Sequence, residues 1–182
     1  LEESGGAKKI AQTFIDTFGQ GHSSWALGIT GLVIGTTVFF EAGVVVLIPL
    51  AFSVASQTKK STLYYGIALL AGLAAGYAFV PPSAGSVLVA GTLGVDLGTM
   101  ILVGIPTAFI AMAIAGVIWG RNVGGRIFTD VPEHFTSAEG ASDEKELPSF
   151  GMVLAIVLTP LCLILLGTLS SYIPVSYTHL TL

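Results

Sequence analysis

Glu41 is the residue of this sequence whose setting is best suited to chemistry. Its carboxylate lies in an apolar run, between the phenylalanine pair 39–40 and the valine run 44–46. A charged side chain at the centre of a bilayer helix costs about 2.5–3.5 kcal/mol on insertion scales, so such residues are mostly functional. We therefore predict that Glu41 exchanges a proton or contacts a ligand. The alternative is a structural carboxylate that caps the helix after it.

Two short runs, 36–43 and 80–86, place hydroxyls, glycines and prolines inside apolar stretches. The double proline at 81–82 removes two backbone donors and disfavours a continuous helix there. Hydroxyls in such runs can bond their own preceding carbonyls or, alternatively, a polar ligand. Helix N-termini beside the breaks can hold a carboxylate. The candidate ligand-binding residues are Thr36, Thr37, Glu41, Gly43, Pro82, Ser83, Gly85 and Ser86.

The other reactive side chains form no catalytic set. Cys162 is the single cysteine, which excludes a disulfide framework and a cysteine-clustered metal site. The three histidines are isolated, and no nucleophile–base pair emerges. We predict neither an enzyme nor a catalytic residue, metal or cofactor. The net charge of −4 also argues against a nucleic-acid partner. Asp96 directly precedes an apolar block, which predicts a helix N-cap.

The elements that must position these residues are predicted by composition. Hydrophobic residues make up 53% of the chain and charged residues 10%, whereas soluble domains carry about 25% charged residues. Apolar blocks cover 25–57, 63–95, 99–119 and 150–173. A bilayer span needs about 20 helical residues, so the last two blocks fit one span each. Each of the first two blocks is too long for one straight span and too short for two. The sequence predicts an all-α polytopic membrane protein, part of a larger one.

The positions of the basic residues favour one topology. If the first block enters the membrane and returns, and the second crosses once, all basic residues lie on the same side, as the positive-inside rule expects. These residues are Lys8, Lys9, Lys59, Lys60, Arg121, Arg126 and Lys145. The first block is therefore predicted to be a re-entrant hairpin with arms of roughly equal length. The alternative is that the first block crosses the membrane twice, which also leaves all the basic residues on the same side.

Seven segments follow from this topology. They are an amphipathic interfacial helix (1–22), a re-entrant hairpin (23–58, tip near 36–43), a broken transmembrane helix (62–95, break 80–86), a transmembrane helix (98–120), a polar cytoplasmic loop (121–148), a transmembrane helix (149–173) and a tail (174–182) that we interpret as a non-native end. The spacings Gly31-x-x-x-Gly35 and Gly72-x-x-x-Gly76 favour close helix packing.

A hairpin tip and a broken helix in successive segments are typical of the binding site of a secondary transporter. We expect the two runs to face each other near the membrane midplane and to bind a small carboxylate. A channel would need a continuous polar pore lining, which these helices lack. The alternative from another functional class is a membrane scaffold or receptor that transports nothing.

Several stretches resemble one transporter family. The runs 3–12 (Glu-Ser-Gly-Gly-Ala-Lys-Lys-Ile-Ala-Gln), 39–43 (Phe-Phe-Glu-Ala-Gly), 47–50 (Leu-Ile-Pro-Leu), 79–82 (Phe-Val-Pro-Pro) and 147–150 (Leu-Pro-Ser-Phe) are similar to the gluconate permease (GntP) family. The resemblance implies an inner-membrane symporter for gluconate, related sugar acids or D-serine, mostly proton-coupled. It also implies the ion-transporter superfamily, with inverted repeats and re-entrant hairpins, of which this chain would be part of one repeat.

The sequence departs from the family pattern beside the double proline. Ser83-Ala84-Gly85-Ser86 stands where the family commonly has a His-Pro-Gly-Pro-like run, and Tyr77-Ala78 replaces a His-Gly pair. The substrate expected from the resemblance is therefore a small hydroxy or amino carboxylate rather than gluconate alone. H⁺ is the expected coupling ion, with Na⁺ as the alternative, and Glu41 is the expected coupling residue. The lipid bilayer is a partner, and a homo-oligomer is left open.

Overall fold

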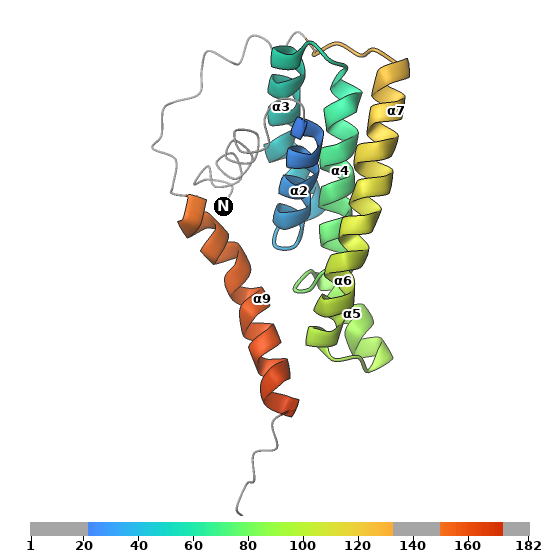
Figure 1. Cartoon of the computed structure of the whole chain (residues 1–182). Coiled ribbons are helices and arrows are strands. Elements are labelled where there is room, and N and C mark those ends of the chain that lie inside the picture. Colours follow the sequence, from blue (N-terminus) through green and yellow to red (C-terminus); the bar gives the residue numbers. More distant parts are fainter. Residues whose placement is uncertain (1–21, 133–149, 173–182) are drawn as a thin grey trace, which may run out of the picture.

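The computed structural model describes residues 22–132 and 150–172, and in this part of the chain the regular secondary structure is all helical (Figure 1). The predicted interfacial helix, apart from its last residue, and the predicted tail lie outside the described residues, as does most of the predicted polar loop. Three stretches are long and apolar enough to cross a bilayer: Phe40–Thr58, Thr62–Leu93 and Leu97–Arg126. The chain therefore has the all-α, membrane-spanning character that its composition predicts.

The first apolar block folds into two helices joined by a tight turn. α2 (Ser23–Gly35) is followed by α3 (Phe40–Thr58), which runs back beside it (Figure 1). The amides of Thr37 and Val38 both donate to the carbonyl of Ile34 at 3.0 Å, which ends α2. The arms are unequal, with 13 and 19 residues, because α3 continues through Pro49 to Thr58. At about 1.5 Å per residue α2 is about 20 Å long and falls well short of the ~30 Å hydrocarbon core, whereas α3, at about 28 Å, comes close to its full thickness. The re-entrant path remains a prediction.

The second apolar block is divided at its double proline. α4 (Thr62–Phe79) ends there, and α5 (Ala84–Leu93) begins after a short irregular segment. The interruption is shorter than the predicted range 80–86, because the Ser83 side chain caps α5 and residues 84–86 already form its first turn. The break thus places a new helix N-terminus next to the C-terminal end of α4.

The third block forms one long helix in three parts. α6 (Leu97–Ala111), the π-helix η2 (Met112–Ile118) and α7 (Trp119–Arg126) follow one another without interruption. The helix therefore passes the predicted end at residue 120. Gly120 and Gly124 let its last turns pack closely against Ile67 and Tyr64 of α4.

Glycines bring α2 and α4 into backbone contact. A Cβ on Gly72 would meet the carbonyl oxygen of Gly28, and one on Gly31 would meet the carbonyl oxygen of Leu69. The close packing predicted from the glycine spacings is confirmed. Around this contact lies a core that also contains Tyr65.

α9 (Phe150–Tyr172) joins the bundle through α6. The Thr168 hydroxyl donates to the Asp96 carboxylate at 3.1 Å, and a Cβ on Gly98 would collide with the Thr168 side chain. The same carboxylate accepts the Thr99 amide at 3.0 Å and so caps α6. The predicted N-cap role of Asp96 is confirmed.

Candidate functional site

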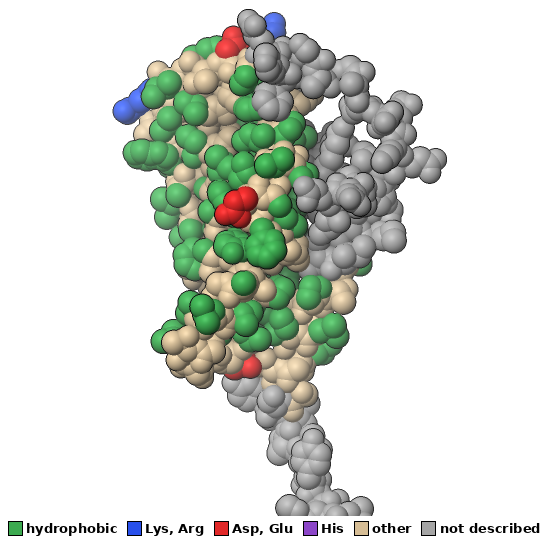
Figure 2. Space-filling model, turned by 180° about the vertical axis from the view of Figure 1, so that it is seen from behind, with side chains coloured by type: hydrophobic (Ala, Val, Ile, Leu, Met, Phe, Trp, Pro, Cys, Tyr) green, Lys and Arg blue, Asp and Glu red, His purple; other side chains and the backbone are tan. Residues whose placement is uncertain are grey.

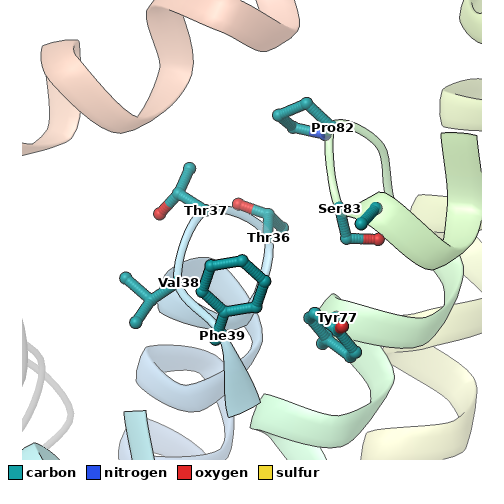
Figure 3. Close-up of a pocket in the computed structure, with 8 residues that line it drawn as sticks. Thr36, Thr37, Val38, Phe39, Tyr77, Pro82 and Ser83 are labelled. Carbon is teal, nitrogen blue, oxygen red and sulfur yellow. The ribbon is translucent and has the colours of Figure 1, made fainter. Parts of the chain in front are cut away.

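The hairpin tip and the helix break face each other across a cavity of about 190 Å³ (Figure 3). Its lining comes from the turn between α2 and α3, from the last turn of α4 and from the start of α5. The lining residues are Thr36, Thr37, Val38, Phe39, Tyr77, Pro82, Ser83 and Ala84. Four of the predicted ligand-binding residues, Thr36, Thr37, Pro82 and Ser83, therefore meet in one place. In Figure 1 the hairpin turn lies partway along the long helix rather than at its end.

Both threonine hydroxyls of the tip use their hydrogens within their own helix. Thr36 Oγ1 donates to the Val33 carbonyl at 2.8 Å, and Thr37 Oγ1 donates to the Ile34 carbonyl at 3.3 Å. This is the local bonding that membrane hydroxyls commonly adopt. Each oxygen keeps acceptor capacity. The tip can therefore accept hydrogen bonds from hydroxyl or amino groups of a ligand.

Ser83 shapes the opposite wall as the N-cap of α5. Its Oγ accepts the Ser86 amide at 3.4 Å and lies 2.8 Å from Ser86 Oγ. Ser86 Oγ also lies 3.0 Å from the Ser83 carbonyl oxygen, to which it donates. Ser86 is fully buried and does not line the cavity. It holds Ser83 in place, so the positive end of the α5 dipole lies at the cavity wall.

An aromatic pair, Phe39 and Tyr77, forms one side of the cavity (Figure 3). Their ring centroids are 6.4 Å apart with an interplanar angle of 51°. Neither was among the predicted ligand-binding residues. Phe39 lies inside the predicted tip, but its aromatic type was interpreted as an apolar neighbour of Glu41. Tyr77 lies one turn before the break, and a helical projection of α4 could have indicated it.

The electrostatics of the cavity come from the backbone. None of the described residues that line it is charged. The N-terminus of α3 begins after Phe39, which offers no side-chain cap, so its first amides are open to a partner. Two helix N-termini, those of α3 and α5, therefore flank one small, uncharged cavity. Such an arrangement favours an anionic group with hydroxyl or amino substituents.

The remaining predicted residues lie away from this cavity. Glu41 is exposed in the first turn of α3 and makes no capping hydrogen bond, so the capping alternative is wrong. Figure 2 shows a face on which hydrophobic side chains surround an acidic one midway between the two ends. Gly43 is buried, where a Cβ would come within 2.7 Å of Leu73 Cδ2, and Gly85 has open space around it.

Comparison with known proteins identifies the family. The model of the GntP family permeases matches residues 1–181. The chain belongs to this family. A gluconate permease of Pseudomonas aeruginosa is 40% identical to this GntP chain over 169 residues, which cover 92% of the chain and 38% of the relative. The family and the apolar helices make it a multi-pass protein of the inner membrane.

Two further relatives of the GntP chain carry different substrate names. The high-affinity gluconate transporter of Escherichia coli is 34% identical over 173 residues, covering 95% of the chain and 39% of the relative. The D-serine transporter DsdX of Escherichia coli O6:H1 is 37% identical over 171 residues, covering 93% of the chain and 38% of the relative. The chain thus spans less than two fifths of the length of these relatives. No solved structure matches it. Among the described residues, no group of side chains has the composition of a metal site.

Proposed function

We propose that this chain forms part of a secondary active symporter that imports gluconate or a related small hydroxy or amino carboxylate. The cavity between the hairpin tip and the helix break carries the proposal, because it is small, contains the hydroxyls of Thr36, Thr37 and Ser83, and is flanked by two helix N-termini. The substrate names of the relatives, gluconate and D-serine, agree in being hydroxylated carboxylates.

In the proposed binding mode, the substrate carboxylate lies against the amides at the start of α3 and α5. Its hydroxyl or amino groups donate to the threonine oxygens at the tip, whose own hydrogens are already used. Phe39 and Tyr77 cover the apolar faces of the substrate and set the width of the cavity. Movement of the hairpin relative to α4 and α5 would open the cavity to either side of the membrane in turn.

Glu41 is the proposed proton-coupling residue, although it does not line the cavity. It lies two residues after Phe39, in the first turn of the helix whose N-terminus faces the substrate. A charged side chain at membrane depth is costly, and acidic residues there commonly belong to proton relays in transporters. Reversible protonation of Glu41 would supply the coupling that symport requires.

The test is uptake of radiolabelled gluconate and D-serine by cells expressing the gene. We expect accumulation that collapses with a protonophore and is unaffected by removal of Na⁺. Accumulation that depends on Na⁺ and not on the proton gradient would identify Na⁺ as the coupling ion. Binding without accumulation would point instead to a receptor. Glu41→Gln should abolish accumulation while leaving the amount of protein in the membrane unchanged, whereas normal proton-driven accumulation in this variant would refute the coupling role.

A further inference from the structure

The four described basic residues gather at the end of the bundle opposite α5. Lys59 and Lys60 follow α3, and Arg121 and Arg126 belong to α7. All four are exposed. On the face shown in Figure 2, the blue side chains lie at one end only. The two pairs come from segments more than sixty residues apart in the sequence, so the fold itself brings these charges together.

A set of hydrogen bonds connects these two segments. The Ser61 hydroxyl donates to the Ile127 carbonyl at 2.9 Å and accepts the Thr129 amide at 3.1 Å. The Thr129 carbonyl accepts the Thr62 amide at 3.0 Å and the Thr62 hydroxyl at 2.8 Å. Lys60 directly precedes Ser61, and Arg126 directly precedes Ile127. The connection therefore brings together the two chain segments that carry these cations.

Acidic partners for these cations are lacking within the described residues. The one described carboxylate at this end, Asp130, accepts the amide of Val131 at 3.0 Å. Lys60 instead lies over the ring of Tyr64, with its Nζ 4.8 Å from the centroid. A cation–π contact leaves the ammonium group free to bind an anion on its outer side.

Apolar side chains are exposed beside the same cations. The exposed fractions are 60% for Trp119, 55% for Ile127 and 68% for Phe128. Trp119 lies about two turns before the end of the long helix, and Trp side chains are enriched at the interface between the headgroups and the hydrocarbon. A soluble anion would gain nothing from this apolar surface, whereas a lipid would contact both parts at once.

We propose that this end of the bundle is a binding site for the phosphate headgroup of an anionic phospholipid. Lys60 and Arg126 contact the headgroup, Lys59 and Arg121 add to the local positive potential, and the exposed side chains at 127–128 contact the acyl chains. The connection through Ser61 positions the two contacting cations. The site is distinct from the cavity, and it does not depend on the proposed transport function.

Native mass spectrometry of the detergent-solubilised protein, titrated with phosphatidylglycerol or phosphatidylcholine, tests this site. We expect tighter binding of phosphatidylglycerol, and Lys60→Gln and Arg126→Gln should each weaken it about five-fold, as expected for one charge at an anionic surface. Val95→Glu changes the net charge by the same amount at the opposite end of the bundle, in the loop before α6, and should have no effect. Ser61→Ala changes no charge and should also weaken binding. Circular dichroism verifies that each variant is folded.

Three results would overturn the proposal. Equal weakening by Val95→Glu would show a response to net charge rather than a site. Full affinity in folded Ser61→Ala would show that the cations act as unconnected surface charges. Displacement of the lipid by inorganic phosphate at the same concentration would identify a soluble anion as the ligand.

Discussion

The contact between α2 and α4 makes a strong prediction about a single methyl group. Gly72→Ala places a Cβ against the carbonyl oxygen of Gly28 and 2.9 Å from the amide nitrogen of Leu32. Both obstacles are backbone atoms, so no side chain can turn away and the two helices must separate. Overpacking costs about 1–3 kcal/mol, and a purely backbone contact belongs at the upper end of that range.

The same helix offers a matched control. Gly66 lies in α4, and nothing approaches within 4 Å of a Cβ built on it. Gly66→Ala should stabilise the protein by up to about 1 kcal/mol through helix propensity alone. Since Gly72→Ala gains the same propensity, the two variants should differ by about 3 kcal/mol in their free energy of unfolding.

Titration with sodium dodecyl sulfate in mixed micelles, followed by circular dichroism, measures this difference. The hairpin tip is attached to α2, so a separation of α2 from α4 should also widen the cavity and weaken substrate uptake. If Gly72→Ala and Gly66→Ala are equally stable, α2 and α4 do not approach as closely as the structure has them, and the reasoning fails.

Two further predictions concern the ends of α5 and α6. The Thr99 amide, with a smaller contribution from the Thr168 hydroxyl, holds the pKa of Asp96 below its usual value. The stabilisation from this carboxylate is therefore present at neutral pH and is lost as the pH falls through the lowered pKa. At that low pH the distance between spin labels on α6 and α9 should increase. Thr168→Val should increase the same distance already at neutral pH. Ser83→Ala removes the N-cap of α5, at a cost of about 1 kcal/mol, and should raise the KM for uptake. Ser83→Thr keeps the cap and should have little effect on the KM. Equal KM values for Ser83→Ala and the unaltered protein would contradict the role of this residue.

The sequence predicted the position of the helix interruptions because their cause is local. Pro81 and Pro82 lack amide hydrogens, and Asp96 has the side chain that a helix N-terminus prefers. The close approach of α2 and α4 was likewise visible in the spacing of Gly31 and Gly72 with their partners. Each of these features depends on a few neighbouring residues, so one sequence is sufficient to find it.

The lining of the cavity was only partly predictable, because it depends on the rotation of each helix. A sequence places Glu41 and Phe39 in the same run, but it does not tell which of them points toward α4. In the structure α3 begins at Phe40. Phe39 lines the cavity, whereas Glu41 is exposed on the outside of the bundle. Tyr77 was missed for the same reason, since the predicted break began after it. The unequal arms of the hairpin depend on where α3 ends, at a left-handed Lys59.

The separation of Glu41 from the cavity has a consequence for the proposed symport. If Glu41 is the coupling carboxylate, the proton and the substrate occupy different sides of one helix N-terminus, and they need not touch. A negative charge in the first turn of α3 competes with the substrate carboxylate for the positive end of the same dipole. Protonation of Glu41 removes that competition, so the proton should bind first and raise the affinity for the substrate. Because the coupling is reciprocal, bound substrate should in turn favour protonated Glu41, and this mutual preference would carry both across the membrane together.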